Sequence, residues 1–392
     1  MGQVGFATLE EALRYAAEHP SVRQIVLAWD GVQTLRAQLS EWSLLRERPM
    51  SLRAAQGHQV VLAITPDENG GLHGLEPPMI ALGPARWTFE GIHWVWNLDP
   101  TLQARQGWSL FELAGSIEAT FRDCTFTISN VDEQGFAVHP NVAVFRVVPN
   151  QPVGMTGDSS EPHETNTAPQ IWLERCLVRG EATLVCHQSG DSMLFSWRQG
   201  ILVTPGRAAM VRPAPSLDPS PPPRVELHFE DVLLFAARGL MLAESSPLEA
   251  TPPELALHLT HCVTVVEPSD PPVAVVDLRG IEAEQWRPPE LTGRRNRYAG
   301  TDVALRVQGE GFEGGRRPYT FEELRMKPPS WYGEELPQPL PRNPWSPWSP
   351  AASLATKRGL VGEPEQQRTL QMLQFEPELW KWIPEAPELE RP

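Results

Sequence analysis

The sequence has few cysteines, and none has the spacing that usually gives cysteine a chemical role. Among 392 residues there are only Cys124, Cys176, Cys186 and Cys262, and they form no CxxC pair. Structural zinc sites need closely spaced Cys or His ligands, and disulfide scaffolds need a higher density of cysteines. The sequence therefore predicts neither a metal site nor a disulfide framework, and we expect reduced thiols in a cytoplasmic protein.

Long apolar runs and basic clusters are also missing. No stretch approaches the roughly 18 apolar residues of a membrane-spanning helix, and no charged start followed by an apolar run opens the sequence. The formal net charge is −16, and the basic clusters at 293–295 and 314–317 are short. An acidic surface opposes binding to nucleic acid. We therefore expect no membrane span, no signal peptide and no nucleic-acid partner.

Recognisable catalytic motifs are missing too. The sequence contains no HRD loop and no DFG motif, which excludes a protein kinase core. The segment GEGFEG (309–314) matches the GxGxxG pattern, but Glu310 and Glu313 would repel phosphate and no strand–helix–strand unit surrounds it. The sequence predicts no cofactor and identifies no enzyme.

A repeated frame of residues is present instead. The segments TFRDCTFTIS (120–129), IWLERCLVRG (171–180) and LHLTHCVTVV (257–266) each run apolar, any, apolar, two mostly polar, small, any, apolar. Four more segments fit this frame: 50–57, 87–96, 195–204 and 227–236. The small position is filled in order by Ala55, Ile92, Cys124, Cys176, Gly200, Val232 and Cys262. Repeats of this length predict a stacked solenoid.

The pattern within each repeat predicts strands joined by bends. Apolar residues alternate at period two, which favours strands over helices, and the polar pair before the small position interrupts the alternation. Further apolar strands are predicted at 142–148, 239–243 and 273–278. The polar segment 149–169, with its prolines and glycines, predicts a loop insertion. Two or three strands per coil with bends between them predict an all-β parallel β-helix.

A ladder of alternating charge supports this register. The residue after the second apolar position is, in order, Arg53, Glu90, Arg122, Glu174, Arg198, Glu230 and Thr260. The next column contains Ala54, Gly91, Asp123, Arg175, Gln199, Asp231 and His261. Equivalent positions in neighbouring coils lie about 4.8 Å apart, and unlike charges at that spacing stabilise the register. Cys124 is then interpreted as a small apolar residue in an inward column, with a redox or catalytic role as the alternative.

The two ends of the sequence differ from the repeats. Residues 6–20 predict a capping helix, because Thr8 and Glu11 form a capping-box pattern ahead of an apolar stripe. Residues 318–392 are rich in proline and tryptophan and predict an extended tail. Its tryptophans either pack back on the β-helix or bind a partner, and we favour the first interpretation. The predicted β-helix domain is 1–317.

Three segments carry a resemblance to a known class. FATLEEALRYAAEHPSVRQIVLAWDG (6–31), MSLRAAQGHQVVLAI (50–64) and WTFEGIHWV (87–95) resemble the opening of right-handed parallel β-helix proteins of the pectin lyase-like class. The resemblance covers roughly residues 6–310 and implies the right-handed form of the β-helix. The sequence is also similar in style to uncharacterised bacterial β-helix domains, some of them joined to Ser/Thr protein kinases.

The class implies a polysaccharide ligand, but its catalytic residues do not transfer. Its lyases need carboxylates for calcium with an Arg or Lys base, and its hydrolases need paired Asp residues. Asp123 and Asp231 share a column but are separated by two intervening coils, and Arg175 and His261 account for them as ladder partners.

A few outward residues remain as candidates for binding. His228 and His258 occupy equivalent positions in adjacent coils, with Asp231 and His261 nearby, and Trp172 lies in the same outward column. Histidines near a carboxylate suit metal binding or acid–base chemistry, and an outward tryptophan suits stacking on a sugar. The alternatives are surface histidines stacked by the register and a tryptophan buried under the 149–169 loop or the tail.

These patterns lead to one functional hypothesis and one alternative. We expect a right-handed parallel β-helix solenoid with a helical cap and a Pro/Trp-rich tail, acting as a non-catalytic scaffold or interaction domain for a protein partner, in a bacterial signalling protein. The alternative is a polysaccharide-binding or polysaccharide-cleaving protein of the pectin lyase-like class.

Overall fold

The computed structural model describes most of the repeat region. The described residues are 4–36, 42, 45, 47–65, 79–98, 108–131, 139, 141–149, 168–212, 222–245, 253–280, 287–309, 315–335 and 338–339. The core of the predicted 149–169 insertion and the predicted tail from residue 340 lie outside them. The predicted boundary at 317/318 falls inside a strand, β24 (Arg316–Thr320).

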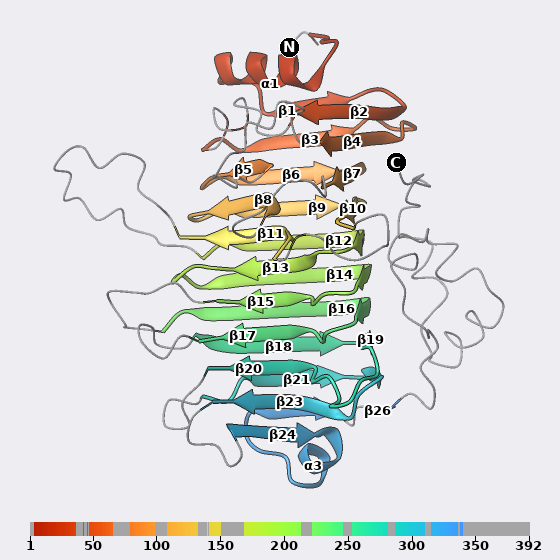
Figure 1. Cartoon of the computed structure of the whole chain (residues 1–392). Helices are drawn as coiled ribbons and strands as arrows, with labels where there is room; N and C mark the ends of the chain where they lie inside the picture. The colour runs from red at the N-terminus through yellow and green to blue at the C-terminus, as the bar shows by residue number, and fades with distance from the viewer. Residues whose placement is uncertain are drawn as a thin grey trace, which may run out of the picture.

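Most described residues lie in parallel strands that stack along one axis, and each coil contributes to up to three rows (Figure 1). The first face consists of β1 (Gln24–Leu27), β3 (Met50–Ala54), β6 (Arg86–Glu90), β9 (Glu118–Arg122), β12 (Gln170–Gly180), β14 (Met193–Thr204), β16 (Arg224–Ala236), β18 (Glu254–Thr260), β21 (Glu290–Arg294) and β25 (Tyr332–Glu335). The C-terminal halves of β12, β14 and β16 continue past a bend into the second face.

The second and third faces complete each coil. The second face also contains β2 (Gly31–Arg36), β4 (Val60–Thr65), β7 (Ile92–Asn97), β10 (Thr125–Ser129), β19 (Val263–Val265), β22 (Arg297–Ala299) and β26 (Gln338–Pro339). The third face is a separate sheet of β5 (Ile80–Leu82), β8 (Ser109–Ala114), β11 (Ala143–Val148), β13 (Thr183–His187), β15 (Ala209–Val211), β17 (Met241–Glu244), β20 (Val276–Arg279), β23 (Val303–Gln308) and β24. The described strands pair in parallel throughout, except β23 with β24. The prediction of an all-β, solenoid-like fold with long parallel sheets is confirmed.

The register predicted from the repeats is confirmed in all but one coil. The strand pairings place Cys124 beside Cys176, Cys176 beside Gly200, and Gly200 beside Val232. The prediction of Ala55 as the small residue of the first copy is wrong, because Val60 is the residue that pairs with Ile92. Residues 55–59 lengthen the bend between β3 and β4 by a loop, which the frame could not distinguish from a strand.

The bend between the first and second faces has a recurring backbone conformation. From the bend between β9 and β10 onward, one residue at each bend has a positive φ between 51° and 58°: Asp123, Arg175, Gln199, Asp231, His261 and Arg295. The left-handed region re-aims the chain in a single residue, so the strand can continue on a new face. This geometry explains why the polar pair interrupts the alternation of apolar residues.

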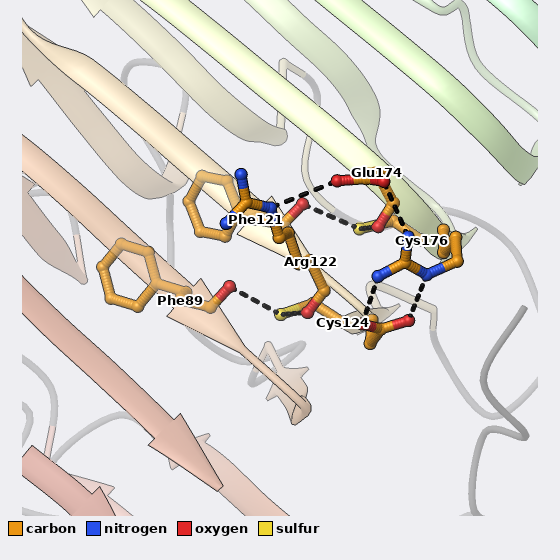
Figure 2. A network of polar contacts seen from close by, with 8 residues as sticks. Phe89, Phe121, Arg122, Cys124, Glu174 and Cys176 are labelled. Carbon is orange, nitrogen blue, oxygen red and sulfur yellow. Dashed lines mark hydrogen bonds and ion pairs between the residues drawn. The ribbon is translucent and has the colours of Figure 1, made fainter. Parts of the chain in front are cut away.

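The cysteines at three of the bends are buried and structural. Cys124, Cys176 and Cys262 are at most 1% exposed. Cys124 Sγ donates to the carbonyl of Phe89 at 3.6 Å, and Cys176 Sγ donates to the carbonyl of Phe121 at 3.5 Å (Figure 2). Each thiol thus bonds to the backbone of the coil before it. Burial raises the pKa of the Cys124 thiol to about 12, which removes its nucleophilic form at neutral pH.

Aromatic rings stacked along the axis fill the core. Phe89 and Phe121 have ring centroids 4.8 Å apart and nearly parallel planes, as their register predicts. Trp87, Trp94 and Trp96 all point inward and are at most 1% exposed. Rings repeated at the coil spacing bury a large apolar area and stack favourably.

Two helices with described bounds accompany the strands. α1 (Leu9–Glu18) lies beyond β1 and β2 at one end of the stack, and it buries Leu9, Leu13 and Ala16 (Figure 1). Thr8 accepts from the Glu11 backbone N–H, as the capping pattern predicts. α3 (Phe321–Met326) follows β24 at the opposite end. Neither described helix has the length and apolar character needed to cross a membrane.

Candidate functional site

A hollow of about 690 Å³ opens on the outer side of the first face. It crosses six strands, from β9 to β21, which corresponds to a length of roughly 24 Å at the strand spacing. Strand alternation places every second residue of the first face on this side, and the register lines these residues up in columns. The central column runs Thr120, Trp172, Ser196, His228 and His258.

Trp172 gives the hollow its apolar surface. Its side chain points away from the core and is 37% exposed, whereas the other tryptophans that the structure describes are buried or partly buried. Its register partners Thr120 and Ser196 are small and polar, so they leave the ring accessible and offer hydroxyl groups beside it. The segments that the alternative places over Trp172, most of the 149–169 loop and the tail from residue 340, lie outside the described residues, so that alternative stays a prediction.

The predicted charge ladder borders the hollow on the bend side. The strand pairings follow the predicted order from Arg53 to Thr260 without a break, so the ladder is confirmed. Arg122 Nε lies 3.1 Å from Glu174 Oε2, and Arg198 Nε lies 3.9 Å from Glu230 Oε2. Because arginines and glutamates alternate along it, this border has no net charge over the middle coils.

His228 and His258 are direct register partners, as the sequence predicts. Their ring centroids are 4.4 Å apart. Sequence analysis missed Glu226, whose Oε2 lies 3.2 Å from His228 Nε2. The signal for it was available, because Glu226 stands two residues before His228 and therefore faces the same side. The other Glu226 oxygen pairs with Arg224, and His258 Nδ1 contacts the Thr292 hydroxyl.

Asp231 and His261 form a separate pair at the bend. His261 Nδ1 lies 3.4 Å from Asp231 Oδ1, and Arg295 Nη1 approaches His261 Nε2 at 3.3 Å. No described contact joins this pair to His228 or His258. The predicted single cluster is thus two pairs, because the positive φ at Asp231 turns the chain between them.

Burial and neighbouring charge shift several pKa values around the histidine pair. Burial lowers the pKa of His258, and the neighbouring His228 lowers it further. The hydrogen bond from Arg224 lowers the pKa of Glu226. At the bend, burial raises the pKa of Asp231, and His261 partly offsets this effect. Near neutral pH the group of Glu226, His228 and His258 therefore offers a charged carboxylate and at least one neutral imidazole.

Each carboxylate that lines the hollow forms an ion pair with an arginine. Glu118 pairs with Arg86 at 2.8 Å, while Glu174 and Glu230 pair with ladder arginines. A glycoside hydrolase needs two carboxyl groups that face each other across the scissile bond, one of them able to donate a proton. Each carboxylate of the hollow instead faces an arginine. The arrangement suits binding through hydrogen bonds and stacking.

Comparisons with protein-family models, with curated proteins and with solved structures find no match for the sequence.

Proposed function

We propose that the chain is a right-handed parallel β-helix of the pectin lyase-like kind that binds an extended polysaccharide without cleaving it. In this proposal the stack of strands forms the binding domain, which extends past the predicted boundary at residue 317 to β25 and β26. α1 caps its first coil, because the open end of a stacked sheet needs cover. The rigid first face then serves as the binding platform.

The observation that carries the proposal is the exposed ring of Trp172 inside an elongated hollow. An extended polymer matches a hollow that crosses six strands better than a compact ligand does. A sugar ring presents C–H groups on its faces and hydroxyl groups at its edge. Trp172 can stack on the former, while Ser196, His228 and the ladder charges can bond the latter.

The paired carboxylates support binding over cleavage. Each carboxylate described in the hollow has an arginine partner, so none is placed as an unpaired general acid or base. Neutral or mixed-charge polysaccharides fit the alternating border better than a strongly anionic polymer, since the protein carries a net charge of −16.

Retention on immobilised polysaccharides tests the proposal. A panel of neutral and acidic polymers is run against the full chain, Trp172→Ala and Met326→Ala. Met326 is the control because it is an exposed apolar residue at the opposite end from α1. We expect retention on at least one polymer, weakened at least tenfold by Trp172→Ala and unchanged by Met326→Ala. Absence of retention across the panel, or equal retention by Trp172→Ala, would reject the proposal and favour a protein partner.

A further inference from the structure

Three side chains at one end of the hollow have the geometry of a metal-binding group. One ligand atom each from Glu226, His228 and His258 lies within 4.8 Å of the other two. His228 Nε2 and Glu226 Oε2 are 3.2 Å apart, close to the roughly 3.4 Å that separates two ligands of one tetrahedral zinc ion. Small rotations of side chains on rigid strands would bring the third ligand to the same distance.

Neighbouring side chains orient Glu226 and His258, as hydrogen bonds to the ligands of a metal ion commonly do in metal sites. Arg224 holds Oε1 of Glu226 and leaves Oε2 beside His228. The Thr292 hydroxyl contacts Nδ1 of His258, which leaves Nε2 for a metal. Arg224 also pairs with Glu290 at 3.0 Å, so its positive charge is balanced by a second carboxylate. Second partners of this kind fix the tautomer and direction of a ligand.

We propose that Glu226, His228 and His258 form a site for a divalent transition-metal ion, with Zn²⁺ as the ion that best fits two imidazoles and one carboxylate. Three protein ligands leave one tetrahedral position open, and both histidines line the hollow. The open position is therefore available to water or to a ligand oxygen. The site stands on its own contacts and does not depend on polysaccharide binding.

Equilibrium dialysis of the metal-free full chain against Zn²⁺ alone tests the site. We expect one Zn²⁺ ion per chain at the site, with affinity at least tenfold weaker in His228→Ala, in His258→Ala and in Glu226→Gln. His261→Ala is the matched control, because His261 is a partly exposed histidine paired with a carboxylate at the bend, and it should keep full affinity. Unfolding of each variant in chelator checks that the fold is intact.

The outcomes separate cleanly. Zn²⁺ affinity that is unchanged in the His228→Ala/His258→Ala double variant would overturn the site, as would a loss confined to His261→Ala. Cu²⁺ bound in place of Zn²⁺ should show coupling to two imidazole nitrogens in its paramagnetic resonance spectrum, and no such coupling in the double variant. Polysaccharide retention is also measured in a parallel sample with chelator and no added metal, so its failure and the failure of metal binding are distinguishable.

Discussion

Arg175 holds Asp123 in a two-point ion pair, although 52 residues separate them in the sequence. Arg175 Nε lies 2.7 Å from Asp123 Oδ1, and Arg175 Nη2 lies 2.7 Å from Oδ2. Both residues have a positive φ at the bend of adjacent coils. The predicted 149–169 insertion lies between them in the sequence. The pair therefore fixes the register of the two coils that are separated by the longest sequence interval.

Loss of this pair should lower stability by a salt-dependent amount. Asp123→Asn keeps a residue that tolerates positive φ and removes the charge. We expect the free energy of unfolding to fall by about 1 kcal/mol at low salt and by less at high salt, because the pair is only partly buried. Urea unfolding at two salt concentrations measures this. Arg86→Gln, which breaks the more exposed pair with Glu118, is the control and should change stability less.

Gly200 should be the least replaceable residue of the small column. An added Cβ would lie 2.1 Å from Trp197 Nε1 and under 3 Å from two further ring atoms, and Gly200 does not have a positive φ. We expect Gly200→Ala to cost about 1–3 kcal/mol through overpacking. Thermal unfolding measures the loss, and adding Trp197→Phe should restore part of it. Gly5→Ala, where no atom lies within 4 Å, should have little effect.

Stability should fall in mild acid because of two buried histidines. Burial lowers the pKa of His93 and of His187 to about 4. Since the unfolded chain has the ordinary pKa near 6.5, it takes up these protons first as the pH falls, and stability is lost between pH 6.5 and about 4. We expect each histidine to contribute about 2 kcal/mol of loss by pH 5.

Urea unfolding at a series of pH values measures this effect. His187→Gln should flatten the profile between pH 7 and 5. His19→Gln is the control, because His19 is exposed at the end of α1. An unchanged profile in His187→Gln would contradict the assignment.

The four thiols should not react with thiol reagents in the folded protein. All are buried, and burial raises the pKa of Cys124 to about 12 and that of Cys176 well above its ordinary value. A disulfide reagent attacks through the thiolate, so we expect no rapid reaction at pH 8 until denaturant is added, and four equivalents afterwards. Rapid labelling of Cys124 in native buffer would show that the reagent reaches this thiol in the folded protein, and would contradict its burial.

The coil register was accessible from the sequence because its signal is repeated. The frame around Cys124 recurs with a polar bend and an alternating charge, and the neighbours of Arg122 and Glu174 follow directly from it. Ala55 was placed wrongly because a loop of polar residues after a strand leaves the same local pattern as a bend. A single copy of a frame cannot reveal an insertion at its own bend.

The candidate site was less accessible, because it depends on how side chains are turned. Pairing of His228 with His258 follows from register alone. The contact of Glu226 with His228, and the separation of Asp231 from both histidines, depend on rotamers and on the backbone turn at the bend. Whether Trp172 is covered depends on which segments cross the first face, and local periodicity carries no information about that.

Polysaccharide binding without cleavage is the central claim, and one incubation tests it most directly. The full chain and Trp172→Ala are incubated with each polymer of the panel, with and without calcium, while retention and polymer chain length are followed together. We predict retention that depends on Trp172, with chain length unchanged. Shortening of any polymer by the full chain would contradict the claim and assign catalysis to the first face.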